Sequence, residues 1–311
     1  MTELPTTISE LPVSSTAAET PAPHPNGAVQ LGEPMPLDDA GVPGLAAAWQ
    51  GAAESMLNLV RAAGDSGWTV PSSCPGWSVG DLVAHLIGIE LMLLGRPDDP
   101  MEVDQTSRPH VRSTFSRYTE IAVMHRLATP CGAVLGEFDA VIAERAAQLG
   151  VTPDDTSVEV LGPRGVMPLG TILRMRTFDT WMHLQDARRA LQLPGDLATP
   201  AAWVTASLIA GSVPFMLGKN LRAPAGSTLL VTVTGPIAFV RGAKVGPDGR
   251  ATRASNPAEL TEPSVAIATD WATFVALAGG RVDPATVADL VHVEGAPELA
   301  ERARGALTMT P

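Results

Sequence analysis

Two side chains that could bind a metal ion, Asp179 and His183, lie four residues apart in the segment RMRTFDTWMHLQDARRA at residues 174–190. On a helix this spacing places them on one face, one turn apart. Most residues along and beside that face are apolar: Ile172, Leu173, Met175, Phe178, Met182, Leu184, Ala187, Ala190 and Leu191. A carboxylate and an imidazole in the middle of an apolar face need partners that offset their loss of water.

A second histidine, His85, lies in the segment SVGDLVAHLIGIELMLLG at residues 78–95. This segment is apolar nearly all round, which is typical of a helix buried inside a bundle. Taken singly, each histidine could be a neutral core residue bonded to a backbone carbonyl. Asp179 alone could be paired with Arg176, which lies on the same helical face.

The energetics of burial favours one explanation for all three residues. An unpaired buried carboxylate costs roughly several kcal/mol, and each unsatisfied imidazole adds about 1–3 kcal/mol. A divalent metal would neutralise them, and two imidazoles with one carboxylate form an open catalytic zinc set. Helix bundles build such sites from inward side chains on facing helices. We therefore predict a divalent metal bound by His85, Asp179 and His183.

The residues that position this site follow a helical pattern, and the pattern changes after residue 225. Apolar periodicity predicts helices at residues 45–63, 79–95, 115–127, 130–149, 169–191 and 201–217. Beyond them STLLVTVTG, SVAIATD and VHVEG read as strands, GAKVGPDGRA as a hairpin, and WATFVALAGGR and PELAERARGAL as helices. The fold class expected is multidomain, with a helical bundle followed by a small α+β domain.

Composition divides the chain into a tail and two domains. Residues 1–38 contain seven prolines and no periodicity, so we expect a disordered and dispensable tail. The bundle is assigned to residues 39–222 and the α+β domain to residues 223–311. The net charge of −12, without a run of Lys or Arg, argues against nucleic acid or an anionic membrane as a partner.

The compartment expected from the sequence is the cytoplasm. The two cysteines form no disulfide framework and no cysteine-based zinc motif, which suits a reducing environment. We find no signal peptide and no stretch of 18 or more apolar residues, and therefore expect no membrane span. Cys74, in SSCPGW just before a helix, could be a thiol activated by the helix dipole, but a packed loop residue is the simpler interpretation.

The segments SSCPGWSVGDLVAHLIGIE and RTFDTWMHLQDARRAL resemble the two signature segments of the mycothiol-dependent maleylpyruvate isomerase family of actinobacteria. ATDWATFVALAGGR and VHVEGAPELAERARGAL resemble the second domain of that family. The resemblance covers roughly residues 45–311. It implies a DinB-like four-helix bundle that binds zinc through His85, Asp179 and His183, and a sterol-carrier-like C-terminal domain. In the isomerases proper the carboxylate is glutamate, one methylene longer than Asp179.

The function that this resemblance implies is a metal-dependent enzyme that uses a low-molecular-weight thiol, mycothiol, on an electrophilic small molecule. Isomerisation follows if the thiol is expelled again, and S-transfer if it is retained. Zn²⁺ is the metal expected, with Fe²⁺, Ni²⁺ or Mn²⁺ as alternatives. Two alternative functions remain: a metal-dependent hydrolase, lyase or non-haem iron enzyme without a thiol, and a non-catalytic carrier with a structural metal. Substrate, catalytic base and oligomeric state are left open.

The mouth of the site is expected at the junction of the two domains, because pockets favour domain interfaces. We predict Trp77 and Trp181 as its walls, and Arg176 as the partner of an anionic group of the thiol or substrate. An ion pair with Asp179 is the alternative for Arg176. Asp186, one turn beyond His183, could accept a hydrogen bond from the imidazole or pair with Arg188 or Arg189.

Overall fold

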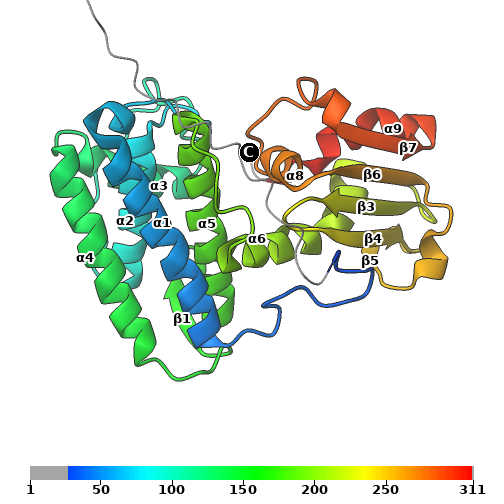
Figure 1. Cartoon of the computed structure of the whole chain (residues 1–311), viewed down its shortest axis with the longest axis horizontal. Coiled ribbons are helices and arrows are strands. Elements are labelled where there is room, and N and C mark those ends of the chain that lie inside the picture. Colours follow the sequence, from blue (N-terminus) through cyan, green and yellow to red (C-terminus); the bar gives the residue numbers. More distant parts are fainter. Residues whose placement is uncertain (1–26, 310–311) are drawn as a thin grey trace, which may run out of the picture.

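The structure is a computed structural model and describes residues 27–309. Figure 1 shows a helical bundle on one side and a sheet with its own helices on the other, with α6 and α8 between them. Residues 1–26, the larger part of the predicted tail, lie outside the described residues. The mixed helical and α+β architecture agrees with the predicted fold class. The boundary between residues 222 and 223 stays a prediction.

Four long helices form the bundle: α1 (Val42–Trp68), α2 (Val79–Leu93), α4 (Cys131–Gly150) and α5 (Leu169–Leu191). A further helix, α3 (Thr114–Arg126), packs on α2. The start of α2 is fixed by a capping box, in which the Ser78 hydroxyl accepts from the Asp81 backbone and the Asp81 carboxylate accepts from the Ser78 backbone. All the helices predicted in this region are present. A short hairpin of β1 (Glu159–Gly162) and β2 (Gly165–Pro168) was not predicted.

The helix predicted at residues 201–217 is divided. The chain forms α6 (Pro200–Gly211), a single turn α7 (Val213–Phe215) and a π-helical turn at Met216–Asn220. Pro214 explains the division, because it has no N–H to donate to the preceding turn. By length and mean hydropathy the stretch Pro200–Asn220 could cross a membrane, contrary to the sequence expectation. However, 61 % of its most apolar window is buried inside the fold, as in the core helix of a globular protein.

The C-terminal domain contains a five-stranded sheet of order β5-β4-β3-β6-β7. The strands are β3 (Thr228–Thr234), β4 (Phe239–Val245), β5 (Ala251–Ala254), β6 (Val265–Asp270) and β7 (Val291–Gly295). Only the central pair β3 and β6 is parallel. Alternate residues of β3 and β6 are buried, as expected for strands with one face on a core. Helices α8 (Trp271–Ala278) and α9 (Pro297–Ala303) follow β6 and β7.

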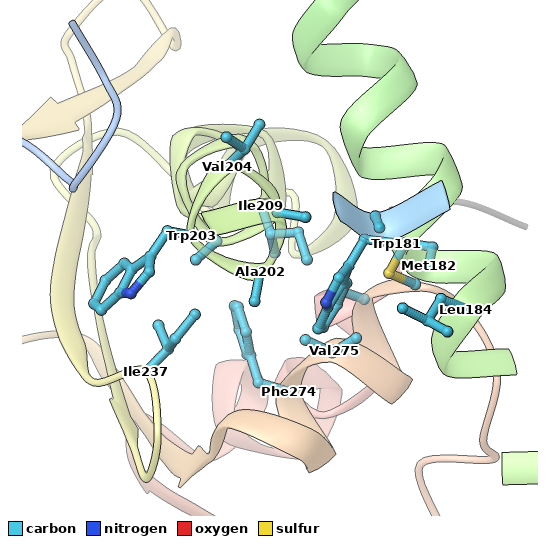
Figure 2. Close-up of a cluster of buried hydrophobic side chains, with 14 of the residues drawn as sticks. Trp181, Met182, Leu184, Ala202, Trp203, Val204, Ile209, Ile237, Phe274 and Val275 are labelled. Atoms are coloured by element: carbon cyan, nitrogen blue, oxygen red, sulfur yellow. The ribbon is translucent and has the colours of Figure 1, made fainter. Parts of the chain in front are cut away.

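The two domains meet in a shared apolar cluster. Figure 2 shows Trp181 of α5 beside Val275 of α8, with Phe274 and side chains of α6 completing the cluster. The Trp181 ring stacks on Trp271, with 5.8 Å between ring centroids. Because these side chains are fully or almost fully buried, the domains are closely docked, and groups of the C-terminal domain can reach α5.

Residues 27–41 connect the two domains a second time, and we call them the clasp. Val29 pairs with the beginning of β4, and Arg241 of that strand donates to two backbone carbonyls of the clasp. At the other end Arg174 of α5 donates to clasp carbonyls, and Met35 is buried in the core. The prediction of a disordered tail is therefore wrong for residues 27–38. The hydrogen bonds of the clasp are accepted by its backbone carbonyls, and the pattern of side chains in the sequence does not predict such contacts.

Candidate metal centre and active site

The three predicted ligands lie together between α2 and α5. His85 Nε2 is 3.1 Å from Asp179 Oδ2, and His183 Nε2 is 3.6 Å from Asp179 Oδ1. One ligand atom from each of the three residues lies within 4.8 Å of the other two. Around a tetrahedral zinc with bonds near 2.0–2.1 Å, two ligand atoms are about 3.3 Å apart, so this spacing fits a single ion. Both imidazoles are buried, whereas the Asp179 side chain is 31 % exposed.

The two imidazoles have opposite electrostatic environments. Burial lowers the pKa of His85, and this effect outweighs the attraction of Asp179. Burial also acts to lower the pKa of His183, but the Asp179 charge and a hydrogen bond with Asp186 raise it to about 10. Burial acts to raise the pKa of Asp179, but the charges of Arg176, His85 and His183 hold it well below its usual value. The centre therefore favours an ionised carboxylate between the two rings.

A buried carboxylate holds the second nitrogen of the His183 ring. Asp186 is fully buried, and its Oδ2 is 3.1 Å from His183 Nδ1. Arg189 donates to Oδ1 at 2.6 Å, and Arg281 of the C-terminal domain donates to both oxygens at 3.1–3.2 Å. Asp186 thus accepts from the imidazole and pairs with Arg189 at the same time, so both interpretations drawn from the sequence are correct. Such an acceptor fixes the orientation of a ligand imidazole.

Arg281 and Cys74 are parts of the site that sequence reasoning missed or ranked low. Arg281 follows α8 in a polar turn, 95 residues from Asp186, and no local pattern identifies it. The Cys74 thiol lies 3.2 Å from Asp186 Oδ2 and 3.8 Å from His183 Nδ1. The sequence favoured a packed loop residue, and Cys74 is indeed packed. It lies against the ring of His183, a predicted metal ligand.

Cys74, His183 and Asp186 form a second group with metal-binding spacing. This group is a poor site, because Asp186 is fully buried and both of its oxygens already accept from arginines. Asp179 differs, because its Oδ1 faces only the His183 ring and its side chain is partly exposed. The group of His85, Asp179 and His183 is therefore the better metal site of the two.

Trp77 lies against both imidazoles, and its role as a wall of the site stays a prediction. Its ring centroid is 5.1 Å from that of His85 and 6.1 Å from that of His183. The indole Nε1 donates to Glu120 of α3 at 2.9 Å. This hydrogen bond fixes the orientation of the Trp77 indole ring.

Glu120 connects this wall to the loop between α2 and α3. Its buried carboxylate also accepts from Arg108 Nε at 2.7 Å and lies 2.8 Å from His110 Nε2. Burial acts to raise the pKa of Glu120, but the hydrogen bonds from His110, Trp77 and Arg108 lower it. His110 packs on Gly76, where an added Cβ would lie 2.7 Å from the imidazole. The loop is thus attached directly to the turn that carries Trp77.

Trp181 does not face the three ligands, and its prediction as a wall of the metal site is wrong. At about 100° per residue, it lies on the side of α5 opposite Asp179. Its indole donates to the Asp196 carbonyl at 3.0 Å, and its ring stacks on α8. There it lines a separate cavity of about 250 Å³ with Gln185, Arg188, Arg189, Leu197 and Val275 among its other walls.

Arg176 forms the ion pair that was the alternative to a substrate contact. It is buried, and its Nη1 donates to Asp179 Oδ2 at 2.6 Å. Its Nε donates to Glu90 Oε1 of α2 at 2.8 Å. The guanidinium therefore bridges two carboxylates, one of which belongs to the candidate metal centre.

Comparison with known proteins finds a similar family and a similar fold. Residues 49–188 match the family model of the mycothiol maleylpyruvate isomerase N-terminal domain. A solved structure described as the mycothiol-dependent maleylpyruvate isomerase shares the fold with a TM-score of 0.51 and 17 % identity, covering 84 % of this chain and 96 % of that chain. The structure of a histidine-to-alanine mutant of that isomerase gives the same TM-score and coverage at 18 % identity.

A comparison with curated proteins gives no significant match. At 17–18 % identity the solved structures establish the fold alone. The family match is independent of that likeness and covers all three predicted ligands, Trp77 and Asp186. Residues 49–188 of the chain are therefore similar to the mycothiol maleylpyruvate isomerase N-terminal domain family.

Proposed function

We propose that this protein is a thiol-dependent isomerase with mycothiol as its co-substrate and a divalent metal, Zn²⁺ in the first place, at His85, Asp179 and His183. The observation that carries the proposal is the convergence of two imidazoles and one carboxylate, from α2 and α5, within 4.8 Å of one another. It falls inside the residues that match the family. The solved structures with the same fold are described as a mycothiol-dependent isomerase.

The donor set fits the proposed metal. Imidazole and carboxylate suit Zn²⁺, with Fe²⁺, Ni²⁺ and Mn²⁺ as alternatives. A bound divalent ion would supply a Lewis acid that favours the thiolate form of a coordinated thiol. Of the residues nearby, Asp186 orients the His183 ring, and Trp77 covers both imidazoles and excludes water from that side.

In the proposed reaction the thiol sulfur forms a bond to an electrophilic carbon of a small molecule. This bond forms as the π bond of a carbon–carbon double bond breaks. Rotation about the resulting single bond, followed by expulsion of the same thiol and return of the double bond, gives isomerisation. Retention of the thiol, with a proton added to the neighbouring carbon, would give S-transfer. The side chains of the centre form no covalent bond in either case. Their part is to bind and orient the two reactants, and the exposed edge of Asp179 gives those reactants a side from which to approach.

That exposed edge supports an enzyme rather than a carrier with a structural metal, since structural zinc sites are closed by four protein ligands. We place the entrance where the domains meet, because Arg281 of the C-terminal domain reaches Asp186 beside the centre. We also assign the bundle to the DinB-like type and the C-terminal domain to the sterol-carrier-like type. The bundle of four long helices and the five-stranded sheet with its helices support these assignments.

Elemental analysis of the purified protein, with variants His85→Ala and His183→Ala, tests the metal site. We expect about one metal ion per chain in the wild type and a loss of stoichiometric metal in both variants. His292→Ala is the matched control, because that histidine is exposed on β7 and pairs only with Glu294. Full metal content in both site variants would rule out the centre. A screen of electrophiles with and without mycothiol then tests the reaction, and equal turnover without the thiol would contradict the proposal.

A further inference from the structure

A buried charged cluster lies directly behind Asp179. It consists of Glu90 on α2 and Arg176 on α5, both almost completely buried. Arg176 donates through Nε to Glu90 and through Nη1 to Asp179, so different edges of one guanidinium contact the two carboxylates. The position of Asp179 Oδ2 is thereby coupled to a carboxylate deep in the bundle.

Glu90 is itself held from several helices. Trp49 of α1 donates its indole N–H to Oε1 at 3.1 Å, and Arg145 Nε of α4 is 3.5 Å from Oε2. With Arg176 of α5, Glu90 thus has partners on three helices of the bundle. Movement of this carboxylate towards solvent would break the two hydrogen bonds to Oε1 and the ion pair with Arg145. Glu90 therefore forms a fixed support for the guanidinium of Arg176.

We propose that Arg176, supported by Glu90, restricts Asp179 to a single metal-binding oxygen and so favours small, four-coordinate ions over larger ones. Oδ2 lies 3.1 Å from His85 Nε2, but it already accepts the short charge-assisted hydrogen bond from Arg176, whereas Oδ1 faces the His183 ring and accepts no such bond from Arg176. An ion between the two imidazoles then has one carboxylate oxygen available. Zn²⁺ accepts such a three-ligand site with an open position. Mn²⁺ prefers more oxygen ligands, which a two-oxygen carboxylate would help to supply.

This inference rests on the proposed metal centre and gives Arg176 a positioning role in it. The role differs from the substrate-anion contact expected from the sequence. One nitrogen, Arg176 Nη2, is buried and has no hydrogen-bond partner among residues 27–309. A contact between that nitrogen and a substrate anion is therefore the competing explanation that the experiment has to separate.

The test uses cobalt-substituted full-length protein and compares Arg176→Lys and Glu90→Gln with the wild type. A lysine keeps the charge but cannot contact both carboxylates through two edges. Glutamine keeps the size of Glu90 but weakens the support. The matched control is Arg188→Lys, on the same helix but paired with Asp196. Circular dichroism and thermal unfolding verify that each variant is folded, and Glu90→Gln serves alone if Arg176→Lys does not fold.

For the wild type and Arg188→Lys we expect the intense visible absorption of four-coordinate Co²⁺. For the other two variants we expect weaker bands of a higher coordination number. We also expect a loss of roughly 10-fold to 100-fold in the preference for Zn²⁺ over Mn²⁺, measured by competition. Unchanged spectra and an unchanged preference would overturn the inference while leaving the metal centre in place. A raised KM with an unchanged spectrum would assign Arg176 to substrate binding instead. Failure of the wild type to bind any metal would overturn both proposals.

Discussion

The nitrogen of His183 that points away from Asp179 has a carboxylate partner, whereas the corresponding nitrogen of His85 has none among the described residues. His183 is thus oriented by hydrogen bonds and charges, and this network includes Arg281 of the other domain. His85 is oriented by its bond to Asp179 and by packing against Trp77. The His183 half of the centre therefore depends on how the domains are docked, and the His85 half depends on the bundle alone.

Removal of the clasp should lower stability more than any other change proposed here. It should also act on the His183 half of the metal centre. A chain that begins at residue 39 lacks two backbone acceptors of Arg241, a residue that is 1 % exposed, and keeps its hydrogen bond to the Val240 carbonyl. The loss of two hydrogen bonds from a charged group costs about 3 kcal/mol or more. We therefore expect a clearly lower melting temperature and a weakened contact between Arg281 and Asp186. The control begins at residue 27, and equal stability of both truncations would show that the clasp does not hold the domains together.

Asp186→Asn should weaken metal binding by about 10-fold to 100-fold, because it removes the charge that orients and polarises the His183 ring. Isothermal titration with Zn²⁺ would measure this change. The matched variant on the other half is Trp77→Phe, which keeps an aromatic ring against His85, and we expect a much smaller loss. If Trp77→Phe lost as much metal affinity as Asp186→Asn, the two halves of the centre would not differ in the way described.

Arg281→Gln should lower the free energy of unfolding by about 1.5 kcal/mol, which is at the lower end for charge-assisted hydrogen bonds. The effect stays small because Arg189 still pairs with Asp186. Denaturant unfolding would measure it, with exposed Arg302→Gln of α9 as the control. We expect metal affinity to fall in the same variant, since the His183 half depends on the domain contact. An affinity equal to that of the wild type would show that Arg189 alone suffices.

Glu120→Gln should have the smallest effect, on the wall beside His85. The pKa of Glu120 lies below its usual value of 4.5, so its contribution to stability is present above that value and is lost as the pH falls through the lowered pKa. We expect the variant to be less stable by about 0.5 kcal/mol at pH 7, at the lower end for a hydrogen bond, because glutamine keeps the size of the side chain and one oxygen that can accept. The difference should shrink below pH 4.5. Melting curves at both pH values check this, and a constant difference would exclude the charge as its cause.

The parts of the site that the sequence predicted are those with a local pattern. His85, Asp179 and His183 interrupt apolar helical faces, and the helices that carry them were predicted within a few residues. Arg281 lies in a turn with no periodicity, and its approach to Asp186 depends on the docking of two domains. Trp181 was predicted as a wall of the site and is instead fully buried against the C-terminal domain. Hydrophobicity alone, however, does not tell which neighbour a buried side chain will meet.

The clasp also determines the order in which the native contacts can form during synthesis. Arg241 and its acceptor at Gln30 are 211 residues apart in the chain. At about 5–20 residues per second, the ribosome needs roughly 10–40 s to make the residues between them. The bundle helices emerge within that interval, while the segment before them still has no strand to pair with. The part of the described chain that is made first is therefore among the last to reach its native position.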